Sequence, residues 1–128
     1  MFTMRTLVVL VVALSACSKK APPAEEEEVV ATSPAADEAR QLFNTVCATC
    51  HGTDGTGNGP AAANLDPKPR NYSDKTWQAA TTDDQIRNII LLGGPGVGKS
   101  ALMPAQVQLK DKPLVVEELV KIVRGFGR

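Results

Sequence analysis

The chain has little of several residue types on which metal sites depend. Its 128 residues include one histidine, three cysteines and three methionines. A structural zinc site needs four Cys or His ligands. His51 is the only histidine, and Cys17 lies in an N-terminal segment, far along the chain from Cys47 and Cys50. A closed tetrahedral zinc site therefore cannot be assembled from this chain alone.

A long hydrophobic run is also missing. Residues 1–17 hold one positive charge at Arg5, a short apolar run from Leu7 to Leu14, and then small residues. This order is typical of a secretory signal peptide and is too short to span a bilayer. Its end, Leu14-Ser15-Ala16-Cys17, resembles a bacterial lipobox, in which the cysteine is acylated and begins the mature chain. We expect a signal peptide over residues 1–16 and a lipid on Cys17, with an ordinary signal peptide and a chance cysteine as the alternative.

The next segment lacks any helical apolar stripe. Residues 18–38 hold Pro22-Pro23, the acidic run Glu25–Glu28 and Ser33-Pro34. Such a composition cannot bury enough surface to offset the entropy of ordering. We therefore expect residues 17–38 to be a lipidated cysteine followed by a disordered tether, spanning roughly 20–30 Å. One small domain would occupy residues 39–128, anchored to a membrane surface without crossing it.

An excess of charge of one sign is absent as well. The formal net charge is +0, and from Ala39 onward 11 Lys and Arg residues stand against 8 Asp and Glu residues. So small an excess does not favour nucleic acid or a specific acidic partner. We expect no nucleic-acid binding.

What the chain does contain is the motif Cys47-Ala48-Thr49-Cys50-His51. Two residues between the cysteines let both sulfurs form thioethers with the haem vinyl groups, and the adjacent histidine becomes an axial iron ligand. A thioredoxin-like redox pair would instead follow a strand, whereas residues 39–46 have a helical pattern. A structural disulfide is a further alternative, but it says nothing about the histidine. With Cys17 acylated, all three cysteines are accounted for in an oxidising compartment.

Hydrophobic periodicity predicts helices separated by loops, with little strand signal. The expected helices are about Asp37–Cys50, beginning at Ser33 or Asp37, then about Thr82–Leu92 and Pro113–Gly125. An irregular loop should fill residues 52–71, with one helical turn at 61–65. This domain has only four aromatic residues, so its own core would be thin, and a large apolar haem would supply the missing buried surface.

A second motif, Gly93-Gly94-Pro95-Gly96-Val97-Gly98-Lys99-Ser100, matches the phosphate-binding P-loop pattern. A P-loop needs a parallel sheet and an acidic residue that holds magnesium. About 90 residues with no other strand signal cannot build that sheet. We therefore expect no nucleotide binding, and a flexible loop that carries the next residues over a flat cofactor face.

Met103 follows this loop and is the only methionine left once the signal peptide is removed. Because His51 is the only histidine, bis-histidine ligation within one chain is excluded. The soft thioether of Met103 is then the expected sixth ligand, which raises the reduction potential relative to bis-nitrogen ligation. Core filling is the usual role of a lone methionine, and Lys99 is a weaker competitor as a ligand.

These motifs together resemble a monohaem class I cytochrome c, in a bacterial lipoprotein form. The resemblance rests on the haem motif with Phe43 before it and on segments that extend to the C-terminus: 57–62, 83–86, 103–105 and 118–124. It implies an all-α fold of three to five helices around one covalent haem c, with the first and last helices crossing. Two residues depart from the family pattern. Ala39 stands where the first helix commonly has glycine, and Ile122 where the last often has an aromatic.

The resemblance also suggests further haem contacts. In this family a proline carbonyl after the motif often accepts the N–H of the proximal histidine, which makes Pro67 and Pro69 candidates. Arg70, Tyr72 and Trp77 have polar tips that could donate to the haem propionates. A surface arginine and two partly buried aromatics are the alternative interpretation of these three residues.

The expected function is one-electron transfer between redox partner proteins, on the periplasmic side of a bacterial membrane. With His51 and Met103 filling both axial positions, the iron has no site for oxygen or peroxide, so we expect a carrier and not an enzyme. Two alternatives remain. One is a haem subunit docked in a larger respiratory complex, and the other a haem protein whose Met103 is displaced by peroxide or a gas.

Overall fold

The structure is a computed structural model that describes residues 32–128. Within this range the chain is helical and has no strand, so the predicted all-α fold is confirmed. The expectations for the signal peptide, Cys17 and most of the tether lie outside the described residues. The α-helices are α1 (Pro34–Leu42), α2 (Ala48–His51), α3 (Lys75–Ala80), α4 (Asp83–Gly96) and α5 (Pro113–Gly125).

The first helical run begins earlier than the expected domain boundary. The Ser33 side chain accepts a hydrogen bond from the N–H of Ala36, and Pro34 stands in the first turn, where its missing N–H does no harm. Residues 34–38, which we expected in the tether, therefore belong to α1. The run continues through a π-helical stretch, Phe43–Cys47, into α2, which ends at His51 and is followed by Gly52 with φ 77°. The predicted helix Asp37–Cys50 is thus one run with a wider turn before the haem motif.

The later helices agree closely with the sequence pattern. Thr82 and Gln85 form a reciprocal capping box at the start of α4. That helix runs to Gly96, past the predicted end at Leu92, and it is broken inside at Gly93. The bounds of α5 are those predicted. The short α3, capped by Asp74, was not predicted, and the expected turn at 61–65 is a 3₁₀ turn, Ala62–Asn64.

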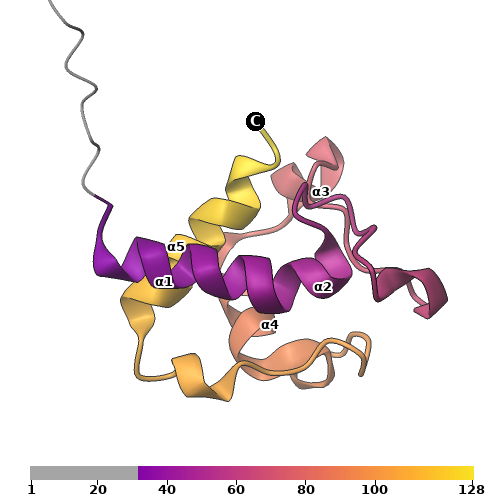
Figure 1. Cartoon of the computed structure of the whole chain (residues 1–128). Coiled ribbons are helices and arrows are strands. Elements are labelled where there is room, and N and C mark those ends of the chain that lie inside the picture. Colours follow the sequence, from indigo (N-terminus) through magenta and orange to yellow (C-terminus); the bar gives the residue numbers. More distant parts are fainter. Residues whose placement is uncertain (1–31) are drawn as a thin grey trace, which may run out of the picture. The chain divides into compact units, whose positions relative to one another are not determined.

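The core lies where the first and last helices meet. α1 packs on α5, and α5 also packs on α4 (Figure 1). Ala39 is completely buried in this core, and Ile122 packs against its edge. The ring of Phe126, just beyond α5, lies 5.4 Å from the ring of Phe43. Phe126 therefore supplies an aromatic contact to the first helical run, which the resemblance had led us to seek at position 122.

Leu119 on α5 is 1% exposed, whereas Leu114 on the same helix is 70% exposed. We expect Leu119→Ala to lower the free energy of unfolding by about 3 kcal/mol, because the substitution removes buried methyl groups and leaves a cavity. Leu114→Ala, the matched control, should have little effect. Denaturant unfolding of both variants measures the difference, and equal midpoints would contradict this packing.

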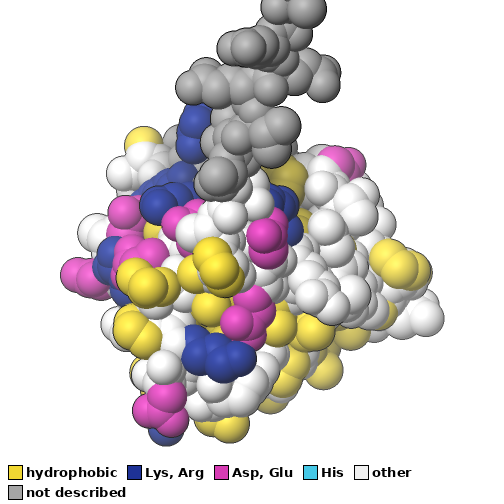
Figure 2. Space-filling view, turned by 60° about the vertical axis from the view of Figure 1, so that its left-hand side comes forward, with side chains coloured by type: hydrophobic (Ala, Val, Ile, Leu, Met, Phe, Trp, Pro, Cys, Tyr) yellow, Lys and Arg dark blue, Asp and Glu magenta, His cyan; other side chains and the backbone are white. Residues whose placement is uncertain are grey.

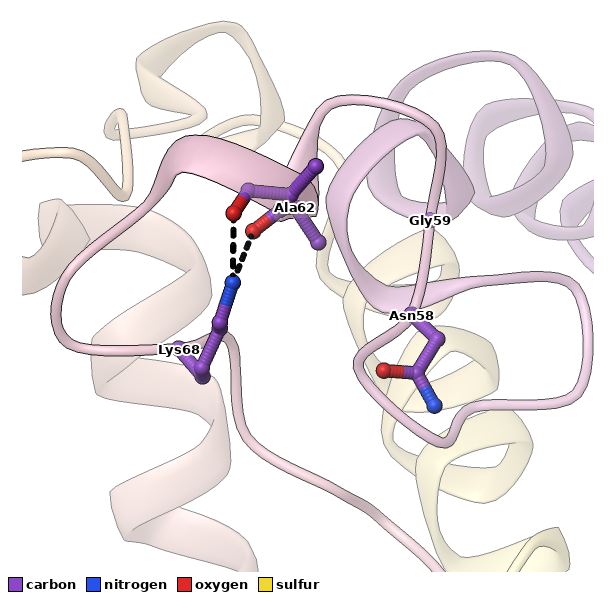
Figure 3. A pocket seen from close by; sticks show the side chains of 5 residues that line it. Asn58, Gly59, Ala62 and Lys68 are labelled. Carbon is purple, nitrogen blue, oxygen red and sulfur yellow. Dashed lines mark hydrogen bonds between the residues drawn. The ribbon is translucent and has the colours of Figure 1, made fainter.

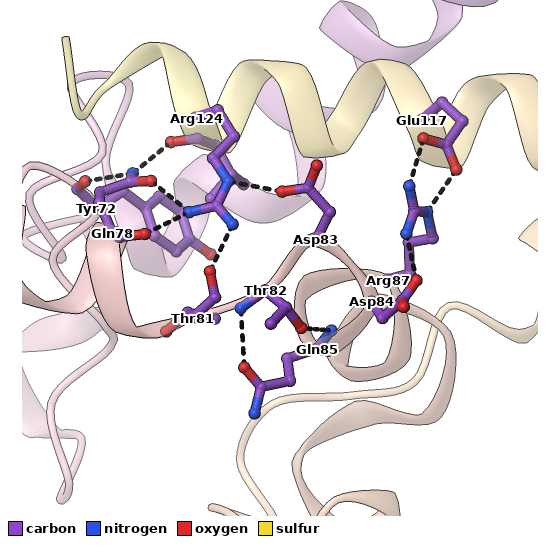
Figure 4. Close-up of polar contacts among 11 residues, drawn as sticks. Tyr72, Gln78, Thr81, Thr82, Asp83, Asp84, Gln85, Arg87, Glu117 and Arg124 are labelled. Atoms are coloured by element: carbon purple, nitrogen blue, oxygen red, sulfur yellow. Dashed lines mark hydrogen bonds and ion pairs between the residues drawn. The ribbon is translucent and has the colours of Figure 1, made fainter.

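Two arginines join α4 to α5 (Figure 4). Arg87 on α4 donates to both carboxylate oxygens of Glu117 on α5, with Nη2–Oε2 at 2.8 Å. Arg124 on α5 pairs with Asp83 at 2.7 Å between Nε and Oδ1. These pairs fix how α4 lies along α5.

The pairing with Arg87 holds the pKa of Glu117 below its usual value of 4.5. A carboxyl group whose pKa is lower in the folded state stabilises the fold above its ordinary pKa, and this stabilisation is lost as the pH falls through the folded-state value. We expect Glu117→Gln to melt below the wild type at neutral pH, with the gap closing in acid. Thermal melts across this range measure it, and Glu118→Gln, which removes only a pair with Lys121 on α5 itself, is the control. A gap that stays constant into strong acid would contradict the prediction.

Positive and negative side chains are interspersed on the face shown in Figure 2, with apolar side chains between them. The ion pairs of the described residues include that of Lys112 with Glu38, at 2.5 Å. This mixing agrees with the small net charge of the domain. Among residues 32–128, no helix has the length and apolar character needed to cross a membrane.

Candidate functional site

A cavity of about 1000 Å³ opens beside α2 and brings together residues from distant parts of the chain. Cys47, Cys50 and His51 line it from the first helical run. Its apolar wall includes side chains of α4 and α5: Ile86, Ile89, Ile90, Leu119 and Val123. The remaining wall comes from the loop after the motif, from α3 and from the segment after α4, and it includes Pro69, Arg70, Tyr72, Trp77, Leu102 and Met103. The structure thus brings every predicted site residue in the described range to one cavity.

His51 is 6% exposed and is held by its two ring nitrogens. Nδ1 lies 3.1 Å from the carbonyl oxygen of Arg70, so it is the nitrogen that carries the proton and donates. Our expectation of Pro67 or Pro69 as the acceptor was wrong, because the chain presents the next carbonyl instead. Nε2 accepts from the hydroxyl of Tyr72 at 3.1 Å. Burial lowers the pKa of His51, so its ring is neutral at neutral pH, and the Nε2 lone pair that accepts from Tyr72 here is the one that a metal would take.

Cys47 and Cys50 are free thiols. Burial raises the pKa of Cys47 to about 11. A redox-active dithiol needs a thiolate near neutral pH, and Cys47 is therefore poorly suited to thioredoxin-like chemistry. The part of the chain from residue 32 onward also holds no cluster of three His, Cys, Asp or Glu side chains suited to a metal ion. The thioredoxin-like and zinc alternatives thus gain no support.

Tyr72 connects His51 to the other aromatic residues of the cavity. Its buried ring stacks on the imidazole of His51 at 4.5 Å and lies 5.6 Å from the ring of Trp77. The guanidinium of Arg70 lies 5.9 Å from the Trp77 ring centre and 3.5 Å from the carboxylate of Asp74. Burial raises the pKa of Tyr72, so its hydroxyl stays protonated and donates to Nε2.

The donor set fits a covalently bound haem. Two thiols two residues apart, a neutral imidazole whose Nε2 faces the Tyr72 hydroxyl, a thioether and apolar walls meet at one cavity. The family model described as "Cytochrome c" matches residues 36–121. The chain belongs to the cytochrome c family. Searches of curated proteins and of solved structures gave no match.

Membership in the cytochrome c family implies a covalent c-type haem and haem-based electron transfer. When bound, a haem supplies an iron centre that gains and loses one electron. The matched range runs from the first helix into α5 and includes the motif, the loop after it and Met103. The remaining features of the site explain how this chain holds those residues in place.

The loop after the motif caps the end of α2. The N–H groups of Gly57, Gly59 and Ala61 donate to the carbonyls of His51, Cys50 and Thr49, at 2.8, 3.0 and 2.9 Å. The last carbonyls of a helix have no partner inside it. The loop therefore satisfies three of them at the haem-binding turn, a role that the sequence showed only as a cluster of glycines.

Gln78 binds the backbone of Tyr72, and Arg124 in turn binds Gln78 (Figure 4). The amide of Gln78 donates to the carbonyls of Tyr72 and Val123, at 2.7 and 2.9 Å. Arg124 donates to the backbone oxygen and to the side-chain oxygen of Gln78, both at 2.8 Å. A chain of contacts thus runs from α5 through Gln78 and Tyr72 to His51. Our sequence analysis missed both residues, because a polar side chain on a helix gives no signal of its tertiary partner.

The glycine-rich segment 93–100 does not have the P-loop arrangement. It overlaps the end of α4 and follows no strand. Its N–H groups donate to carbonyls of the chain itself: Gly94 to Met103, Lys99 to Gly94 and Gly98 to Pro95. A phosphate cradle needs such N–H groups to point at the ligand.

A second, smaller cavity of about 190 Å³ lies beside the capping loop (Figure 3). Lys68 lines it, and its ammonium donates to the carbonyls of Ala62 and Ala63 at 2.9 and 2.7 Å. These contacts close the 3₁₀ turn against the segment that leads to Pro69 and Arg70. The lysine therefore has a structural partner within the loop.

Proposed function

We propose that this chain is a one-electron carrier in which His51 and Met103 are the axial ligands of a single haem c joined to Cys47 and Cys50. The observation that carries the proposal is the convergence of these four side chains on one cavity of about 1000 Å³. The Nε2 of the neutral His51 ring, which would exchange the Tyr72 hydroxyl for the iron, and the soft sulfur of Met103 are suitable iron ligands. Among residues 32–128, Met103 is the only methionine and His51 is the only histidine.

The carrier role follows from this ligand set. Two protein ligands leave no place at the iron for a substrate, so the chain would exchange electrons with redox proteins and would not be an enzyme. A cavity wall made largely of aliphatic and aromatic side chains favours a buried haem with limited access of water.

We place the protein on the periplasmic side of a bacterial membrane, held by a lipid on Cys17. The support is the order of a basic residue, a short apolar run and Leu14-Ser15-Ala16-Cys17. The acidic and proline-rich residues up to Ser33 would form the tether. A haem subunit fixed in a larger respiratory complex would have the same anchor.

Optical spectra of the purified holoprotein, oxidised and reduced, test the ligand set. A weak far-red band in the oxidised form marks methionine–iron ligation in this family. Spectra that stay unchanged on addition of carbon monoxide or cyanide support the carrier. A high-spin spectrum that responds readily to either would contradict it, in favour of a displaceable methionine.

Met103→Ala gives the sharpest version of this test. The substitution removes the thioether, so we expect the far-red band to disappear and the reduction potential to fall. Leu102→Ala is the matched control, because Leu102 is the preceding residue and also lines the cavity. Its spectrum should equal that of the wild type. An unchanged band in Met103→Ala would show that the sixth ligand is another group.

A further inference from the structure

The helix α4 is broken three residues before its end, at Gly93. This residue has φ 68° and ψ 179°, which is not helical, and Pro95 follows in the first turn of the short helical piece beyond it. Only glycine adopts this backbone region at low cost, and proline is well placed in a first helical turn. The double glycine and the proline, which look like a nucleotide-binding loop in the sequence, are thus the residues of a sharp helix break.

The break frees two backbone groups of α4, and these bind the segment Met103–Gln106, which we call the methionine segment. In an unbroken α-helix the N–H of Gly94 would donate to the carbonyl of Ile90. Here the N–H of Gly94 donates to the carbonyl of Met103 at 2.9 Å. The carbonyl of Ile90 accepts from the N–H of Gln106, also at 2.9 Å. One hydrogen bond of the helix is in effect replaced by two that hold the segment Met103–Gln106 at both ends.

The same glycines let the segment come this close. A Cβ on Gly93 would lie 2.6 Å from the N of Ala105 and 2.8 Å from the carbonyl oxygen of Met103. A Cβ on Gly94 would overlap the carbonyl oxygen of Ser100. All of these neighbours are backbone atoms, which cannot move aside as a flexible side chain can. A side chain at position 93 therefore pushes the methionine segment away from the helix, and one at position 94 displaces Ser100 before it.

We propose that the helix break at Gly93–Gly94 is the positioning device for Met103, and that it sets how firmly this ligand stays on the iron. The proposal rests on the proposed function, because it takes Met103 to be the axial ligand. Gly93 and Gly94 are positioning residues: they touch the backbone of the ligand segment and hold it beside the cavity. An alanine at position 93 raises the fraction of molecules in which the methionine has left the iron.

Gly93→Ala and Gly98→Ala form a matched pair for the test. Gly98 has nearly the same φ, 70°, but a Cβ there would meet nothing within 4 Å. Both variants place an alanine at a positive φ, but only at position 93 would its Cβ meet the backbone of the methionine segment. We expect the oxidised holoprotein with Gly93→Ala to bind cyanide about tenfold more tightly than the wild type, since apparent affinity rises with the fraction in the open state. Its far-red band should weaken, whereas Gly98→Ala should match the wild type in both.

The outcomes separate this inference from the function on which it rests. If Met103→Ala keeps the far-red band, the axial ligand is another group, and both proposals are overturned. If Met103→Ala loses the band while Gly93→Ala and Gly98→Ala bind cyanide alike, the ligand is right and only the positioning role is overturned. A tighter cyanide complex in Gly93→Ala alone supports both.

Amide hydrogen exchange of the wild-type holoprotein gives a second test that needs no variant to fold. The N–H groups of Gly94 and Gln106 should exchange slowly, because each donates to a carbonyl across the break. Exchange of either at the rate of an unstructured peptide would overturn the proposal. Slow exchange of both supports it.

Discussion

Replacement of both Cys47 and Cys50 by serine is expected to leave the chain without covalently attached haem. Serine has nearly the shape of cysteine, but its hydroxyl does not form the thioether that the sulfur forms. Both thiols line the cavity together with His51, so the two bonds and the axial ligand act at one place. We expect the mass of the purified double variant to be that of the polypeptide alone, whereas the wild type carries one haem more. Each single variant should keep one thioether and a weaker haem attachment.

Cys17→Ser is the matched control, since it changes the third cysteine and leaves the motif intact. It should keep its covalent haem in full. On our proposal of a lipid anchor it should also leave the membrane fraction for the soluble periplasmic fraction. Covalent haem in the double variant would show that the motif is not the attachment site, and a membrane-bound Cys17→Ser would argue against the anchor.

Gly59→Ala is expected to destabilise the domain strongly, through the loop that caps α2. A Cβ at this position would lie 2.5 Å from the carbonyl oxygen of Thr49 and 2.7 Å from the carbonyl carbon of Cys50, and closer still to the carbonyl of Ala48. These atoms belong to the helical backbone that carries the haem motif, so the loop must move. Its hydrogen bonds to the last carbonyls of α2 would then be lost. We expect the free energy of unfolding to fall by about 3 kcal/mol or more, the upper end of the range for overpacking.

Gly125→Ala separates this clash from the general effect of adding a methyl group. Gly125 is the last residue of α5, and a Cβ there would meet nothing within 4 Å. We expect this variant to unfold at or slightly above the wild-type midpoint, because alanine favours a helix more than glycine does. Denaturant unfolding of the two holoproteins measures the contrast. Equal stability of the two variants would mean that the loop does not approach α2 as closely as the structure has it.

Much of the helical framework follows from local patterns in the sequence. Pro113 and Gly125 punctuate α5 so clearly that its bounds are those we predicted. The hydroxyls of Ser33 and Thr82 cap α1 and α4 as the sequence suggested. These helix ends depend on residues within one or two turns of each other, so the local sequence is enough to predict them.

Contacts between distant segments could not be predicted in the same way. The acceptor for His51 is the carbonyl of Arg70 because of the path of the loop, and every residue has a carbonyl. The support of Tyr72 by Gln78 depends on where α3 lies against α5. The double glycine was predicted to be a flexible loop, although it forms a fixed break in α4, because its sequence does not reveal which backbone it must approach.

The packing of α1 on α5 has a consequence for the order in which the domain is completed. Residues 34–42 and 113–125 are the two ends of the described chain, and they bury each other. Contacts at such a large sequence separation form only once the end of the chain has been made. Until then the turn with Cys47 and Cys50 belongs to an unfinished core. This topology leaves an interval, before the domain is complete, in which both thiols are still accessible for thioether formation.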